Sequence, residues 1–328
     1  MYLQFYYARN NPNRLLFSPV ETSPKNSLDQ NTAVLPISCM RFRRIMRTVM
    51  PIAILAILFG LFANLSPAPI TYPVSASELD ECSGIAHGRL NPDLLYAHND
   101  SGGSPTVFVL NLEGMLKHKL ILQGVRNRDW EDIAVGPGPE EGKPYIFVGE
   151  IGDNNGRYEH VAIYRFPEPS LTGADSVLSV SAFDTLRIEY EDGARDAEAL
   201  MVDPRTKDIY LISKREAEVG VYKVAFPQST TELNRAIKIA TLPYNWVTAA
   251  DISPKGDRIL VKTYTNVYRY KRGKRQSIAQ ALSRNPKALA YTLEPQGEAI
   301  CFDLKGKGRL TLSEKHEGID LQLYYYRR

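Results

Sequence analysis

The sequence predicts an all-β chain built from repeated four-stranded units. Its 19 Tyr, 22 Gly and 21 Pro favour strands and turns. A short pattern recurs along the chain, in which a polar residue precedes a pair of small or apolar residues. It is clearest within 129–134. Aligned on Glu131, the copies are 48, 67, 52 and 48 residues apart, at Ser83, Glu131, Glu198, Ala250 and Glu298. A period of roughly 40–50 residues is typical of a propeller blade, so we expect a five-bladed β-propeller, with six blades as the alternative.

Each repeat reads as short strands separated by Gly, Pro, Asn or Asp. The first three repeats give strands at 83–86, 94–97, 106–110 and 117–122; at 132–135, 145–149, 161–166 and 185–190; and at 199–202, 209–213, 220–225 and 236–241. The fourth gives strands at 250–253, 258–263, 267–270 and 288–293, with a short surface helix at 277–283. Residues 167–183 form an insertion, and a sixth blade would have to lie within this longer second repeat.

The fifth repeat has only three strands, at 299–304, 309–313 and 321–326. A blade without its fourth strand would leave an exposed edge that is prone to aggregation. Ile70, Tyr72 and Val74 alternate with other residues in segment 69–74, as in a strand. We therefore expect this segment to complete the last blade, and the propeller domain to span 69–328.

Charge is unevenly distributed along the chain. Seven of the 40 basic and two of the 37 acidic residues lie within 1–76, which leaves 33 basic and 35 acidic groups, a net charge of −2, in the remainder. Nucleic-acid binding needs a basic face on the folded domain itself. No nucleic-acid partner is therefore expected.

Residues 40–68 have the features of a signal peptide or a signal anchor. Four arginines precede the uncharged apolar run 49–65, and small residues at 74–76 offer a cleavage pattern. Two alternatives stay open, an uncleaved membrane-spanning helix and a cleaved signal. In both, the arginines place the propeller outside the cytoplasm, in the periplasm or at the cell surface.

The first 39 residues show no periodicity. Met40 and Met46 would each give a more usual start to the signal segment. Residues 1–39 are therefore expected to be a poorly structured leader that lies upstream of the true start.

Three glutamates, Glu131, Glu198 and Glu298, start the innermost strand of their repeats. In a propeller they would converge at the mouth of the central channel and repel one another unless a cation or protons compensate. Calcium, which takes oxygen ligands, is the simplest compensation. The strand entries and the turns around the same mouth are predicted to add a fourth metal ligand, Asp153, and a set of residues for a small anionic ligand: Asp100, Trp130, Asn154, Arg157, Lys214 and Arg215.

Each of these residues also has a structural interpretation. A glutamate at a strand start can cap the preceding turn, Asp153 and Asn154 can simply form a turn, and Trp130 can pack between blades. The chain lacks Gly-x-Ser-x-Gly, His-Glu-x-x-His and an EF-hand loop, and its five histidines have no zinc-ligand spacing. Convergence of the side chains is what favours a functional site.

The repeated pattern resembles that of a known group of proteins. The copies Ser83-Gly-Ile-Ala, Trp130-Glu-Asp-Ile-Ala, Ala197-Glu-Ala-Leu, Ala249-Ala-Asp-Ile and Gly297-Glu-Ala-Ile are similar to the once-per-blade pattern of the SdiA-regulated and TolB-like extracytoplasmic bacterial β-propellers. The layout also resembles the calcium-activated nucleotidases, whose acidic blade entries surround a central calcium. The chain departs from an all-acidic ring at Ser83 and Ala250, so three of the five aligned positions are acidic. The Asp129-Trp-Glu-Asp and Ile151-Gly-Asp-Asn motifs look like those of uncharacterised secreted bacterial proteins.

Three functions follow as hypotheses. The first is a membrane-anchored or secreted extracytoplasmic propeller that binds a small anionic ligand or a cell-envelope protein, with calcium at the channel mouth. The second is a calcium-dependent phosphoesterase or nucleotidase, in which the cation activates water and Arg157, Lys214 or Arg215 holds the phosphate. The third is an interaction scaffold that needs no metal.

Overall fold

The computed structural model describes residues 67–174 and 176–327. Within these ranges the chain is all-β, as the sequence predicts, and its described helix is the five-residue α2 (Ile278–Leu282), which Ser277 caps within the predicted helical segment. The leader and nearly all of the predicted signal segment lie outside the described residues. Among the described residues, no helix has the length and apolar character needed to span a membrane.

The strands follow the predicted runs closely. In chain order they are β1 (Ile70–Pro73), β2 (Cys82–His87), β3 (Leu94–Asn99), β4 (Thr106–Asn111), β5 (Leu116–Leu122), β6 (Trp130–Pro137), β7 (Pro144–Glu150), β8 (Val161–Pro167), β9 (Ser176–Val180), β10 (Asp184–Tyr190), β11 (Ala197–Val202), β12 (Ile209–Ser213), β13 (Val219–Val224), β14 (Asn234–Leu242), β15 (Val247–Ile252), β16 (Arg258–Thr263), β17 (Val267–Lys271), β18 (Lys287–Leu289), β19 (Gly297–Phe302), β20 (Arg309–Ser313) and β21 (Gln322–Tyr326).

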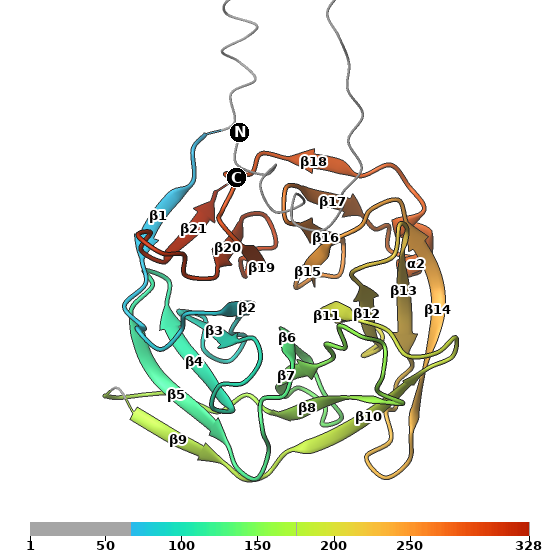
Figure 1. Ribbon diagram of the computed structural model, residues 1–328, viewed down its shortest axis with the longest axis horizontal. Helices are drawn as coiled ribbons and strands as arrows, with labels where there is room; N and C mark the ends of the chain where they lie inside the picture. Colours follow the sequence, from blue (N-terminus) through green and yellow to red (C-terminus); the bar gives the residue numbers. More distant parts are fainter. Residues whose placement is uncertain (1–66, 175, 328) are drawn as a thin grey trace, which may run out of the picture. The chain divides into compact units, whose positions relative to one another are not determined.

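The strands form five sets in which neighbouring strands pair antiparallel, and these sets surround the centre of the view in Figure 1. The sets are β2-β3-β4-β5, β6-β7-β8-β10, β11-β12-β13-β14, β15-β16-β17-β18 and β19-β20-β21. β1 pairs antiparallel with β21, with Ile70 opposite Tyr325. The prediction that segment 69–74 completes the last set is therefore confirmed.

The insertion at 167–183 adds an outer strand to an existing sheet. Its β9 pairs parallel with β5, with His118 opposite Ser176. β10, which follows the insertion, pairs parallel with β14, so that two sets merge into one eight-stranded sheet. The extra residues of the second repeat thus form an outer strand on the first set, and the strand that follows them joins the second set to the third.

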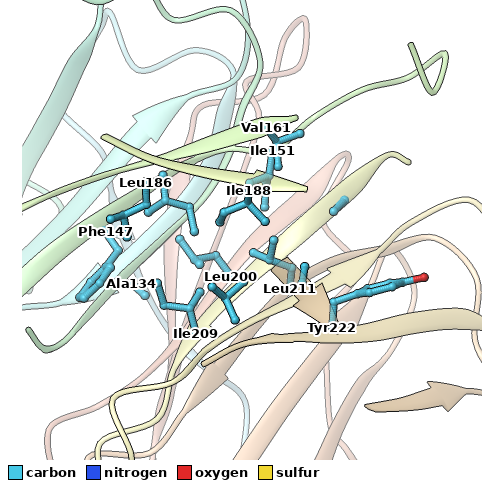
Figure 2. Close-up of a cluster of buried hydrophobic side chains, with 14 of the residues drawn as sticks. Ala134, Phe147, Ile151, Val161, Leu186, Ile188, Leu200, Ile209, Leu211 and Tyr222 are labelled. Atoms are coloured by element: carbon cyan, nitrogen blue, oxygen red, sulfur yellow. The ribbon is translucent and has the colours of Figure 1, made fainter. Parts of the chain in front are cut away.

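The first strands of the five sets, β2, β6, β11, β15 and β19, lie at the centre, and each packs against the next, with β19 against β2. Apolar clusters fill the spaces between the sets. Figure 2 shows one of them, in which Phe147 and Ile188 face Leu200 and Leu211. Burying each such side chain stabilises the fold by about 1.5–3 kcal/mol. These clusters hold the inner strands in place.

Two aspartates, the buried Asp132 and the half-buried Asp251, connect neighbouring inner strands. Asp132 on β6 accepts the backbone N–H of Leu200 on β11 at 2.9 Å, and Asp251 on β15 accepts that of Phe302 on β19 at 2.7 Å. Burial raises the pKa of Asp132 well above its ordinary value and that of Asp251 to about 6. The neighbouring inner strands do not pair with each other through backbone hydrogen bonds, so these carboxylates satisfy backbone N–H groups that face the next strand.

A β-bulge interrupts every inner strand at its second residue. The pairing skips one residue in each, namely Ser83, Glu131, Glu198, Thr248 and Glu298. The predicted equivalence of Ala250 is therefore wrong, and Thr248 takes its place. The error arose because Asp251-Ile252 resembles Asp132-Ile133 but lies two residues deeper in its strand. With this correction, all five bulged residues carry a side-chain oxygen.

Candidate metal centre

The candidate site lies where the inner strands begin. A bulge redirects the side chain of the extra residue, here at the entry of each inner strand. The first residue after each second strand reaches the same end of its sheet, because the two strands are antiparallel. These residues are Asp100, Ile151, Lys214, Tyr264 and Glu314. The two sets of positions, together with Asp129 and Asp196 just before β6 and β11, form the centre.

Glu131 is shared by two groups of carboxylates. One group contains Asp100, Asp129 and Glu131, and the other contains Glu131, Asp196 and Glu198. In each group, one oxygen per residue lies within 4.8 Å of the others. Glu131 is only 2% exposed, and Ser83 donates a hydrogen bond to its backbone oxygen at 2.5 Å. The buried Glu131 thus joins two sets of oxygen ligands.

Glycine at 152 allows this close approach. A Cβ atom at Gly152 would overlap Oε1 of Glu131 and would lie 2.5 Å from Cγ of Asp129. Real Cβ contacts do not become this short, so any side chain here would displace the two carboxylates. The Gly in the Ile151-Gly152-Asp153 motif therefore shapes the centre from its rim.

Lys214 compensates part of the negative charge. Its Nζ lies 2.6 Å from Oε1 of Glu198 and 3.7 Å from Oε1 of Glu298, and Tyr264 donates a hydrogen bond to the same Glu298 oxygen at 2.5 Å. Burial alone would lower the pKa of Lys214, but Glu198 and Glu298 outweigh it and hold that pKa above its ordinary value. Lys214 therefore carries a fixed positive charge.

The carboxylates still exceed the cations. Burial, followed by the charge of Glu198, raises the pKa of Glu131 well above its ordinary value. Burial also raises the pKa of Glu198 to about 8, although Lys214 opposes the shift, and that of Asp100 to about 7 with help from Asp129. Within the described part of the chain, Oε2 of Glu198 is buried and has no hydrogen-bond partner. The centre thus contains a buried carboxyl oxygen without a partner and more carboxyl groups than cations.

Several predicted site residues meet here as expected. Glu131, Glu198, Glu298, Lys214 and Asp100 all lie at the centre. Arg215 lies at its edge, where Nε pairs with Asp196 at 2.5 Å and the guanidinium also donates to Asn154. Asn154 and Arg157 are exposed. Lys214 and Arg215 were predicted to hold an anion, but each is already paired with a carboxylate.

Two assignments need correction. The carboxylate oxygens of Asp153 accept the backbone N–H groups of Arg157 and Tyr158, both at 2.9 Å, so Asp153 caps its own turn instead of joining the acidic groups. Trp130 is completely buried and packs against His98 and Tyr164, with ring centroids 5.6 and 6.1 Å away. A ligand cannot touch Trp130 in this arrangement, so the packing interpretation is confirmed.

The sequence interpretation missed Asp129 and Asp196 as members of the centre. Each lies two residues before a bulged glutamate, in Asp129-Trp-Glu131 and Asp196-Ala-Glu198. The repetition of Asp-x-Glu in two consecutive repeats was the available signal. Glu314 was also missed. Burial, followed by nearby Glu298, raises its pKa to about 8.

Comparison with known proteins gives no further identification. No protein-family model matches the chain, and no curated protein matches it at a significant level. The resemblance to extracytoplasmic propeller families therefore stays a prediction, and the geometry of the centre carries the functional argument.

Proposed function

We propose that the chain is a five-bladed β-propeller that binds a divalent cation, calcium first, where its inner strands begin, and holds a small ligand there. The observation that carries this proposal is the position of Glu131, which belongs to two groups of carboxylates beside the unpartnered, buried Oε2 of Glu198. The apolar run 49–65 and the arginines before it support a location outside the cytoplasm.

Five blades are supported by the repetition of one unit. Every set begins with an inner strand that has a bulge at its second residue, and the inner strands pack in succession from β2 round to β19. The long second repeat yields β9, which extends the sheet of β5. This use of the insertion favours five blades over six.

A hard divalent cation suits the chemistry of the donors. All ligand atoms in the two groups are carboxylate oxygens, which calcium prefers and which suit zinc or copper less well than nitrogen or sulfur. Lys214 contacts Oε1 of Glu198 and Oε1 of Glu298. The carboxylate of Glu131 and Oε2 of Glu198 therefore remain as ligands for a cation. A bound cation would lower the raised pKa values of these carboxylates.

The rim of the centre supports a small ligand. Trp246 is 44% exposed, adopts a φ of 55°, and has the guanidinium of Arg215 5.4 Å from its ring centroid. Arg128 lies 3.9 Å over the ring of Tyr158, which is also exposed. Exposed aromatic faces at the rim suit a planar ligand, which can stack on them.

We expect calcium to bind the wild-type chain with one strong site per chain at pH 8. Glu131→Gln and Glu198→Gln should each weaken binding at least tenfold, since each removes a charged ligand at the centre, and a tenfold change corresponds to about 1.4 kcal/mol. Isothermal titration calorimetry on the full chain, after removal of bound metal by a chelator, measures this.

The matched control is Glu140→Gln, which removes an exposed carboxylate paired with Lys143. It should bind calcium like the wild type. Absence of binding heat for calcium, manganese and magnesium in the wild-type chain would contradict the proposal. Calcium-dependent turnover of phosphate esters, lost in both centre variants, would instead favour the phosphoesterase alternative.

Calcium affinity should rise with pH between about 6 and 8.5. The pKa values of about 7 for Asp100 and about 8 for Glu198 mean that both groups hold protons at the lower pH, and a cation must displace them. Binding at pH 7 should therefore release protons. Calorimetry in buffers of different ionisation enthalpy measures this release, and a pH-independent affinity would mean that these carboxylates are not ligands.

A further inference from the structure

A second pocket lies at the opposite ends of the same inner strands. It has a cavity volume of about 510 Å³, within the range of small-molecule sites. Val135, Val202 and Ile252, at the ends of β6, β11 and β15, line it together with Pro137 and Pro254. At about 3.3 Å per strand residue, the pocket is more than 10 Å from the carboxylates at the strand starts. Its walls are mainly apolar.

Arg89 brings a cation without an ion-pair partner among the described residues to this pocket. Its guanidinium Nη1 is buried and has no hydrogen-bond partner among the described residues. The nearby carboxylate of Asp251 forms no ion pair with it, although the guanidinium opposes the rise in the Asp251 pKa that burial causes. An unpaired, buried guanidinium nitrogen is costly unless a ligand satisfies it.

The other charged residues that line the pocket have partners elsewhere. Lys143 pairs with Glu140 at 2.5 Å, and Glu141 pairs with Lys207 at 3.1 Å. The backbone of Arg89 is fixed, because its N–H and that of Leu90 donate to the carboxylate of Glu168. The turn thus holds the base of Arg89 in place and leaves its side chain available.

We propose that this pocket binds a small organic anion with an apolar body, whose charged group contacts Arg89 and whose body lies against Val135, Val202 and Ile252. Carboxylate, sulfonate and phosphate groups share this chemistry, since each accepts paired hydrogen bonds from a guanidinium. The pocket is separate from the cation centre, and its occupation does not depend on metal.

The test uses the fluorescent sulfonate 8-anilino-1-naphthalenesulfonate with the full chain. We expect saturable binding, unchanged by a chelator and displaced by octanoate more strongly than by 1-octanol. Arg89→Gln should weaken octanoate displacement about tenfold, whereas Arg126→Gln, which removes an exposed arginine outside the pocket, should leave it unchanged. Octyl phosphate in place of octanoate tells which anionic group is preferred.

Leu90→Trp provides a second variant, because Leu90 is an exposed residue of the pocket wall and a larger side chain there obstructs entry. It should reduce dye binding without lowering the melting temperature. Equal displacement by octanoate and octanol, or wild-type affinity in Arg89→Gln, would overturn the proposal. Dye binding is measured with a chelator present and therefore does not require calcium. A negative result for this pocket can thus be told apart from a negative result for the cation centre.

Discussion

Replacing Lys214 by alanine is expected to lower the free energy of unfolding by about 3–5 kcal/mol in a metal-free buffer. Lys214 is 6% exposed and is the ion-pair partner of Glu198 and Glu298, which are buried as well. Its removal leaves both carboxylates without a counter-charge in a medium of low dielectric. Urea unfolding of the wild type and the variant, after chelation, measures the difference.

Calcium should restore part of the stability that Lys214→Ala loses, because a bound cation supplies the missing positive charge. Lys214→Met, which keeps most of the volume, separates the loss of charge from the loss of packing. The control Lys143→Ala breaks an exposed pair with Glu140 and should change stability by no more than about 0.5–1 kcal/mol. A loss below about 1 kcal/mol in Lys214→Ala would show that the buried carboxylates are compensated in some other way.

The Glu168→Ala substitution should also lower the free energy of unfolding by about 3–5 kcal/mol, by breaking a buried charged network. The Glu168 carboxylate is buried and accepts five different donors at 2.9–3.1 Å: the backbone N–H groups of Arg89, Leu90 and Asn91, the side-chain amide of Asn91 and the hydroxyl of Tyr96. The substitution leaves these donors unsatisfied. Thermal and urea unfolding give the magnitude.

Glu168→Gln keeps an acceptor oxygen but adds an amide that faces donors, so its loss should be smaller than that of alanine. Glu159→Ala removes an exposed glutamate and should alter stability by less than about 0.5 kcal/mol. If Glu168→Ala unfolded at the same urea concentration as the wild type, the network would contribute nothing, and the turn at 88–91 would be held by other contacts.

The sequence predicted the all-β fold because its repeat length and turn residues are local properties. It also predicted that segment 69–74 would complete the last set, and β1 pairs with β21 as expected. It could not show the bulges, because a bulge depends on pairing with the next strand and has no apolar signature of its own. The fourth repeat was therefore aligned on Ala250 instead of Thr248.

The sequence predicted several residues of the candidate site but not which of their charged side chains form ion pairs. Repeated glutamates at strand starts indicated convergence, and Glu131 and Glu198 do lie together. Which charges neutralise one another depends on side-chain positions across different strands, so Lys214 was interpreted as an anion holder when it faces Glu198. Burial cannot be read from residue type alone either, and Trp130 was misplaced for that reason.

Anomalous scattering from crystals grown with manganese tests the cation centre most directly. We expect a peak beside Glu131, within about 2–2.6 Å of its carboxylate and near Oε2 of Glu198, because hard cations contact oxygen ligands at that distance. The peak should be absent from crystals of Glu131→Gln grown in the same solution. A wild-type map without a peak at these carboxylates, at a manganese concentration that gives peaks elsewhere on the protein, would contradict the proposed function.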